Sequence, residues 1–146
     1  MPTASRLIAA LLMAGTGIIL ALELRELRDS LRFYPFFIEF NALLGAVIGW
    51  KLVGARVGYG WARAAATGIS GGFVTLILVV FGLAFREMLN RAFRKFYDHA
   101  LEAILAAVKI GITDLLAISA TAMILPVIMG AVLSGLGAEA AERRWR

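Results

Sequence analysis

The sequence predicts an all-α polytopic membrane protein: a single membrane domain over residues 1–146, with about four transmembrane helices and amphipathic helical segments between the third and the fourth. Composition is the first indication, because 61% of the residues are hydrophobic and 17% are charged, against roughly 45–50% and 25% in soluble domains. Distribution is the second, since the charges collect at 23–39, 51–63, 86–114 and 139–146 and leave long uncharged runs between them. A backbone in lipid must satisfy its own hydrogen bonds, so each run is expected to be a helix.

The first predicted span covers about residues 5–24. Its centre, 7–22, carries no charge, and a helical stripe of leucines continues beyond it. A cleaved signal peptide, with Arg6 as its basic region, is the alternative interpretation. That alternative is disfavoured because the apolar run is long for a signal peptide and no small-x-small cleavage site precedes Glu23.

The other predicted spans are about residues 36–53, 64–85 and 118–139. The second is the least regular, because Glu39 and Asn41 interrupt it near its start. The third is uncharged throughout, and at 1.5 Å per residue it is long enough to cross roughly 30 Å of hydrocarbon. The fourth lies almost wholly in an uncharged run that contains Pro126.

Residues 86–114 connect the third and fourth predicted spans, and their apolar positions recur at helical spacing. This pattern predicts two amphipathic helical segments, one on each side of a turn at Tyr97, Asp98 and His99. The first segment is expected to continue the third span. Both are expected to lie at the membrane interface or to pack on a partner.

Five polar or charged residues are candidates for functional or headgroup contacts: Glu39, Asn41, Lys51, Arg56 and Arg63. Polar groups in a membrane are costly, so Glu39 is a candidate for a proton relay, an ion site or a substrate contact, unless it only reaches the headgroups. Asn41 is expected to hydrogen-bond to a neighbouring helix. The glycine-rich loop 51–63 has backbone N–H groups beside arginine that could bind an anion such as a lipid phosphate. Anchoring at the interface is the plainer interpretation of this loop.

Small residues recur at four-residue spacing in three of the predicted spans. The pairs and triplet are Gly45 and Gly49, Gly68 and Gly72, and Gly130, Ser134 and Ala138. Small residues let helix backbones approach closely in lipid. Packing within one bundle is the favoured interpretation, and an interface between copies of the chain is the alternative.

The same loop, 51–63, decides the predicted orientation. With four spans both termini share one side, and the Lys and Arg totals of the two sides nearly balance. The loop carries three basic residues and no acidic one. Basic loops favour the cytoplasm, so both termini are predicted to be cytoplasmic.

Several function classes are disfavoured. The sequence lacks the common motifs of nucleophilic or metal-assisted hydrolysis, so no catalytic, cofactor-binding or metal site is predicted and the protein is expected to be non-enzymatic. The single histidine, His99, is interpreted as part of a polar turn. The net charge of +5 comes from residues that flank apolar runs, which favours membrane lipids rather than nucleic acid as the partner.

Features along nearly the whole chain occur in the order found in one known family. They are Met1-Pro2-Thr3-Ala4-Ser5-Arg6-Leu7, Phe40-Asn41-Ala42 with Gly45, Gly49-Trp50, Gly54, Arg56, Gly58 and Gly60, the stretch from Tyr97-Asp98 to Leu101-Glu102-Ala103, and the ending Arg143-Arg144-Trp145-Arg146. Together they resemble the TrgA family, tellurite-resistance-associated membrane proteins of alphaproteobacteria. The family offers no catalytic motif to transfer to this chain.

The resemblance implies a multi-pass protein of the bacterial inner membrane that is associated with tellurite resistance or related stress tolerance. Because the chain has no cysteine, it cannot reduce tellurite through its own thiols. Two other functions remain open: an accessory structural subunit of a larger membrane complex, and a small permeation protein for an oxyanion or another solute. Both a homo-oligomer and a larger membrane complex are compatible with the sequence.

Overall fold

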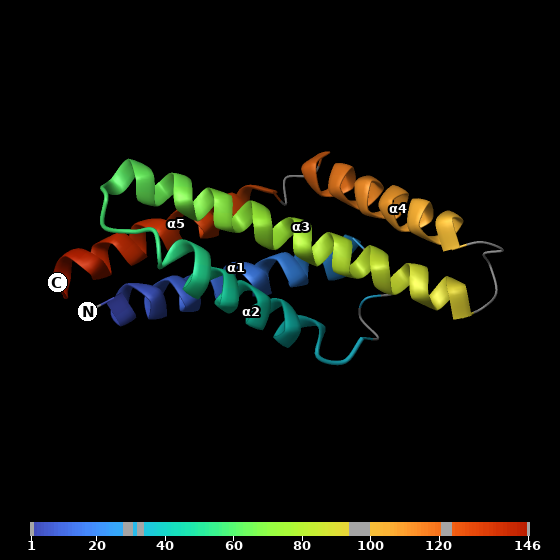
Figure 1. Ribbon diagram of the computed structural model, residues 1–146, viewed down its shortest axis with the longest axis horizontal. Coiled ribbons are helices and arrows are strands. Elements are labelled where there is room, and N and C mark those ends of the chain that lie inside the picture. The colour runs from blue at the N-terminus through green and yellow to red at the C-terminus, as the bar shows by residue number, and fades with distance from the viewer. Residues whose placement is uncertain (1, 28–30, 32–33, 94–99, 121–123, 146) are drawn as a thin grey trace. The chain divides into compact units, whose positions relative to one another are not determined.

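The computed structural model describes residues 2–27, 31, 34–93, 100–120 and 124–145, and the regular structure in these ranges is entirely helical. In chain order the helices are α1 (Pro2–Leu27), α2 (Phe37–Ile48), the π-helical η2 (Gly49–Val53), α3 (Trp61–Phe93), α4 (Ala100–Ala120) and α5 (Ile124–Arg144) (Figure 1). The predicted all-α class is therefore confirmed. The chain forms two compact units, one made of Met1–Thr75 with Leu125–Arg146 and the other of Leu76–Ile124.

Three of the described helices are long and apolar enough to cross a membrane, so the four-span count is not confirmed. They are Ala4–Leu27 in α1, Trp61–Ala92 in α3 and Ile124–Arg144, which is α5. The predicted span 36–53 is helical, but it is divided between α2, with 12 residues, and η2, with 5. At 1.5 Å per residue α2 alone reaches only about 18 Å.

The predicted fourth span, 118–139, overlaps α5, which lies at Ile124–Arg144 and is long and apolar enough to cross a membrane. Helix α4 extends to Ala120 and α5 begins at Ile124, while residues 121–123 lie outside the described part of the chain. Pro126 falls in the first turn of α5, where the backbone N–H groups have no partner within the helix and a missing one costs little. Pro126 is therefore compatible with the beginning of α5.

Helices α1 and α2 run antiparallel and touch through their backbones (Figure 1). A methyl group added at Gly45 would collide with the carbonyl oxygen of Met13, and one at Gly49 with that of Ala9. On the α1 side, a methyl group at Gly17 would collide with the carbonyl oxygen of Asn41. Small residues four apart therefore let these two helices approach, as the sequence predicts.

The second and third small-residue patterns join α3 to α5 and α5 to α1. Gly68 and Gly72 lie against Ala131, and a methyl group at Gly135 would collide with the carbonyl oxygen of Ala64. Gly130 lies against the side chain of Thr16 in α1. All three patterns thus pack helices within one chain, which supports the favoured interpretation of them.

The apolar core of the unit made of Met1–Thr75 with Leu125–Arg146 joins residues from three helices and η2. Ala9 and Met13 of α1, Ile48 of α2, Val53 of η2 and Ala138 of α5 form one buried cluster. Met13, Val53 and Ala138 are fully buried. The core therefore fixes the beginning of α1 beside the end of α5, and η2 leads from it into the connection before α3.

In the unit Leu76–Ile124, the later part of α3 packs on α4. A methyl group at Gly111 would lie 3.6 Å from Ala84 and from the ring of Phe81. The prediction that the first amphipathic segment continues the third span is confirmed, because α3 is continuous to Phe93. The predicted turn at Tyr97, Asp98 and His99 lies outside the described residues.

Helix α4 carries the second predicted apolar stripe on an exposed face. The predicted members are Leu101, Ile104, Leu105, Val108 and Ile112, and Leu116 is exposed as well. Lys109 is also exposed, whereas Asp114 is 9% exposed and therefore buried. The helix thus has a buried face and an exposed apolar face rather than a simple division into polar and apolar sides.

Candidate functional site

The five predicted contact residues do not form one site. Glu39 is exposed in the first turn of α2, whereas Lys51 is exposed in η2. Twelve residues separate them along the helix, which is about 18 Å. Arg56 and Arg63 are exposed still further along the chain, on either side of the turn that precedes α3. The carboxylate and the three cations therefore cannot line a common polar site.

Asn41 is 1% exposed, so its burial is as expected for a polar residue in a helix interface. Its hydrogen bond differs from the prediction. The side-chain Nδ2 donates to the carbonyl oxygen of Phe37, 2.6 Å away and four residues earlier in α2. The backbone carbonyl of Asn41, rather than its side chain, faces Gly17 of α1. Close backbone approach leaves little room for a bridging amide, which is why the bond is made within the helix.

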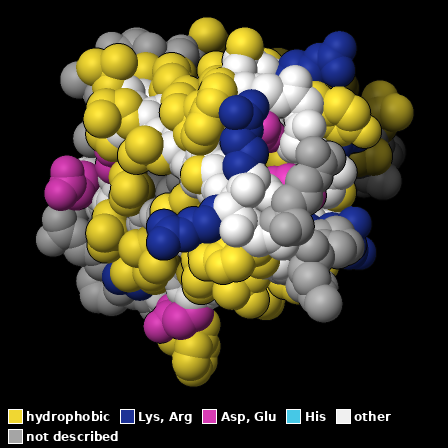
Figure 2. All heavy atoms as spheres, turned by 90° about the vertical axis from the view of Figure 1, so that its left-hand side faces the viewer, with side chains coloured by type: hydrophobic (Ala, Val, Ile, Leu, Met, Phe, Trp, Pro, Cys, Tyr) yellow, Lys and Arg dark blue, Asp and Glu magenta, His cyan; other side chains and the backbone are white. Residues whose placement is uncertain are grey.

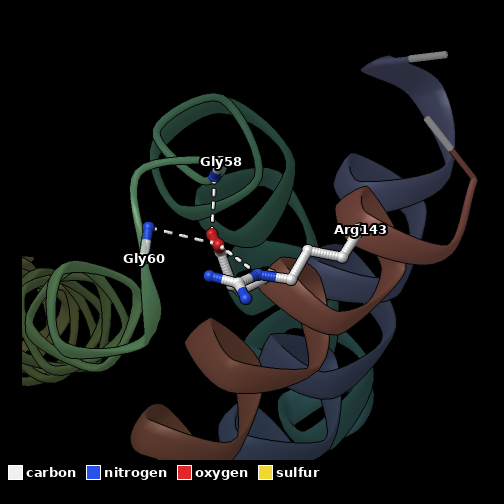
Figure 3. Close-up of polar contacts among 4 residues, drawn as sticks. Gly58, Gly60 and Arg143 are labelled. Carbon is white, nitrogen blue, oxygen red and sulfur yellow. Dashed lines mark hydrogen bonds and ion pairs between the residues drawn. The ribbon is translucent and has the colours of Figure 1, made fainter.

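The connection between η2 and α3 contains a feature that only glycine readily forms. Gly58 has a φ of 99° and Gly60 a φ of 113°, values that are unfavourable for residues with a Cβ. This backbone directs two N–H groups to one side of the turn, toward the end of α5 (Figure 3). Two converging N–H groups of this kind form a concavity suited to an anion.

The anion at this turn is the carboxylate of Glu139, from α5. The N–H of Gly58 donates to Oε2 at 2.6 Å, and the N–H of Gly60 donates to Oε1 at 3.2 Å (Figure 3). Arg143, one helical turn later, donates from Nε to Oε1 at 3.0 Å. We refer to Gly58, Gly60, Glu139 and Arg143 as the carboxylate clasp.

Burial makes the clasp necessary for Glu139. This residue is 1% exposed, and a buried carboxylate is costly unless charged or N–H donors surround it. The Arg143 side chain is 52% exposed, and its guanidinium carbon lies 4.8 Å from the ring centroid of Trp61. Trp61 is the first residue of α3, so the cation–π contact adds a link between the beginning of α3 and the end of α5.

Cations and aromatic rings surround the clasp. The guanidinium carbon of Arg63 lies 5.7 Å from the centroid of Tyr59, whose side chain is largely exposed. A cavity of about 270 Å³ adjoins the clasp and is lined by Gly58, Glu139, Glu142 and Arg143. Figure 2 faces the end of the bundle where α5 finishes, and it shows Lys and Arg side chains standing among hydrophobic ones. Interfacial anchoring of the loop, which the sequence predicts, stays a prediction.

The predicted anion-binding property of loop 51–63 is thus present, but the anion differs from the one expected. Instead of a lipid phosphate, the backbone holds a carboxylate of the same chain. Sequence reasoning missed Glu139 and Arg143. The available signal was that Glu139 is the first charge after the uncharged run 115–138 and has an arginine four residues later. Local spacing does not reveal a hydrogen-bond partner about eighty residues away.

The geometry of the clasp suits binding of the Glu139 carboxylate rather than use of that carboxylate as a general base. Both oxygens of Glu139 accept hydrogen bonds, so the clasp leaves neither oxygen without a donor. Among the residues that the structure describes, no group of three or more His, Cys, Asp or Glu side chains could hold a metal ion. No family model matches the chain, and neither a search of curated proteins nor a search of solved structures finds a match.

Proposed function

We propose that the chain is a non-enzymatic, multi-pass protein of the bacterial inner membrane that raises tolerance to tellurite or to a related stress. One observation carries the proposal: residues on which the TrgA resemblance rests hold the bundle together. Gly45 and Gly49 bring α2 against α1, and Gly58 and Gly60 bind the Glu139 carboxylate. A resemblance at positions with such strict steric demands favours a shared architecture rather than a chance similarity of composition.

The mechanism that we propose is indirect. The chain has no cysteine, so the protein does not supply the thiols that reduce tellurite. It acts instead through the membrane, by transport, by maintaining membrane integrity or through another complex. Cytoplasmic termini are part of the proposal. They are supported by cations that are exposed in η2, in the connection before α3, and at the beginning of α3 and the end of α5: Lys51, Arg56, Arg63, Arg143 and Arg144.

Deletion of the gene tests this proposal. The deletion strain should grow less well on tellurite, and the wild-type chain should restore growth. Restoration should fail with Gly45→Ala, which disturbs the α1–α2 contact, and should succeed with Gly15→Ala, because a methyl group at Gly15 meets nothing within 4 Å. Unchanged tolerance after deletion, in a strain that normally makes the protein, would contradict the proposal.

A second candidate function is that of an accessory subunit in a larger membrane complex. The exposed stripe on α4 favours it, since Leu101, Leu105 and Leu116 are each more than 60% exposed and a regular stripe can accept a neighbouring helix. Purification in mild detergent followed by mass spectrometry should then recover stoichiometric partners. A monodisperse particle that contains only this chain would exclude the accessory role. The permeation alternative gains no such support. The polar residues available for a route, Glu39, Asn41 and those of the basic loop 51–63, are spread along α2, η2 and the connection before α3.

A further inference from the structure

Exposed cations from separate segments gather at one end of the unit made of Met1–Thr75 with Leu125–Arg146 (Figure 2). They come from η2, from the connection that follows it, from the first turn of α3 and from the end of α5. The clasp holds these segments together, because the N–H groups of Gly58 and Gly60 bind the carboxylate of Glu139. We call these cations the basic rim: Lys51, Arg56, Arg63 and Arg144.

The charge of the basic rim is not balanced by acidic side chains of the same segments. Arg143, the other arginine at the end of α5, is paired with Glu139. In the part of the chain that the structure describes, no residue of the rim takes part in an ion pair. The one further acidic residue described in these segments is Glu142, which is half-buried. A single carboxylate therefore faces four cations, and the surface stays positive.

All three tryptophans of the chain lie at the same end. Trp50 belongs to η2, Trp61 is the first residue of α3 and Trp145 follows α5, and all three side chains are exposed. Tryptophan rings prefer the boundary between lipid and water. Helices α1 and α3 begin at this end and α5 ends there (Figure 1), and each is long and apolar enough to cross a membrane. Cations at the ends of such helices lie at the depth of the lipid headgroups.

We propose that the basic rim and the tryptophans beside it form a surface that selects anionic phospholipids, such as phosphatidylglycerol, over zwitterionic ones. The unbalanced cations attract the negative headgroups, and the exposed rings pack at the boundary with the acyl chains. A free inorganic anion would make only the first of these contacts, so a lipid is the better fit. The N–H groups that Glu139 occupies take no part. The inference requires that the chain spans a membrane, but it does not depend on the role in tellurite tolerance.

Quenching of tryptophan fluorescence by brominated lipid tests the proposal, because every tryptophan of the chain lies at this surface. The purified chain is reconstituted into vesicles of phosphatidylcholine with brominated acyl chains, which quench the fluorescence. Part of this lipid is then replaced by unbrominated phosphatidylglycerol or by unbrominated phosphatidylcholine. Phosphatidylglycerol should restore more fluorescence, with a relative affinity about fivefold or more in its favour, as expected for at least one cation near an anionic headgroup. The preference should decrease in concentrated sodium chloride, which screens exposed charges.

Matched double variants locate the preference. Arg56→Gln combined with Arg144→Gln removes two exposed cations of the rim, so the relative affinity should fall most of the way to one. Arg91→Gln combined with Lys109→Gln removes the same charge from exposed positions in the unit Leu76–Ile124, and this control should keep the wild-type preference. Arg56→Lys combined with Arg144→Lys retains the charge of the rim and should also keep it.

Three results would overturn the proposal. The first is equal recovery of fluorescence with the two unbrominated lipids in the wild type. The second is a loss of preference in the Arg91 and Lys109 control as large as in the rim variant, because the preference would then follow net charge alone. The third is a greater loss in sodium phosphate than in sodium chloride of the same ionic strength, which would show that the surface takes a free phosphate instead of a lipid. None of these measurements involves growth on tellurite, so either proposal can fail without the other.

Discussion

Replacing Gly45 with alanine tests whether backbone contact holds α1 and α2 together. The added Cβ would lie 2.9 Å from the carbonyl carbon of Met13 and 3.3 Å from the Cα of Ala14, and it would collide with the Met13 oxygen. Carbon atoms in contact prefer about 3.5–4.0 Å. All three neighbours are backbone atoms of α1, so no side chain can rotate away and the two helices must separate.

Two opposed effects determine the magnitude. Alanine is favoured over glycine inside a helix by about 0.5–1 kcal/mol, whereas overpacking of a close contact costs about 1–3 kcal/mol. Gly15→Ala provides the matched control, because it lies in α1 and a methyl group there meets nothing within 4 Å. Gly15→Ala should therefore stabilise by about 0.5–1 kcal/mol, and subtracting the two variants cancels the helix preference and leaves the steric cost.

Unfolding in mixed detergent micelles, followed by circular dichroism, gives the free energies of unfolding for both variants. We expect a gain for Gly15→Ala and a net loss of up to about 2.5 kcal/mol for Gly45→Ala, which is the steric cost less the helix preference. Equal changes would show that α1 and α2 do not approach through Gly45, and they would refute the small-residue interpretation of this interface. A loss at both positions would show instead that Gly15 is also packed.

Three further predictions concern the clasp and the α1–α5 contact. In Gly60→Ala the added methyl group meets no atom within 4 Å, but the φ of 113° at this position is strained for alanine. The substitution should therefore lower the free energy of unfolding by about 1–3 kcal/mol. Gly82→Ala in helix α3 is equally open and should not lower it. Trp61→Leu should cost about 0.5–1 kcal/mol, measured in the same assay, and much less in an Arg143→Gln background if its contact with that guanidinium matters. Gly130→Ala would place a methyl group 2.6 Å from Oγ1 of Thr16, so a double-mutant cycle with Thr16→Ala should show partial compensation, and strict additivity would exclude the contact.

The helices that local composition determines were predictable. The uncharged runs within α1, α3 and α5 exceed what a soluble helix needs, and a backbone in lipid has few alternatives to a helix. The residues 86–93 likewise continue α3, as their spacing indicates. These features depend on residues within a few helical turns of one another, so the spacing of apolar and charged residues in the sequence is enough to predict them.

The second predicted span shows where such reasoning fails. Composition could not reveal that α2 ends at Ile48 and gives way to a π-helical segment, in which Gly54 N–H donates to Gly49 O at 2.7 Å. At this point both glycines lie against α1: a methyl group at Gly49 would collide with the Ala9 carbonyl, and one at Gly54 would lie 2.5 Å from the Cα of Arg6. The local geometry is coupled to contacts between distant parts of the chain, and a single sequence carries no direct record of them.

The candidate site was half predictable for the same reason. Gly58 and Gly60 sit close together beside cations, and this local pattern indicates an anion-binding turn. The identity of the anion depends on how α5 packs, and Glu139 resembles any acidic residue near the end of an apolar run. The local geometry of the turn shows that it can bind an anion, but the tertiary fold determines which carboxylate of the chain lies there.

Substitutions at the buried glycines and at the exposed cations should affect tolerance to tellurite in different ways. Glycines at helix contacts tolerate no side chain for steric reasons, so Gly45→Ala and Gly135→Ala should lower tolerance to tellurite by lowering the amount of folded protein. Exposed cations make no such contacts with the core, so Lys51→Gln and Arg56→Gln should leave the amount unchanged. Growth on tellurite, normalised to the protein measured in isolated membranes, separates the two effects. If reduced tolerance in the glycine variants persists at normal protein levels, those positions take part in the function itself, and the purely architectural account of the resemblance fails.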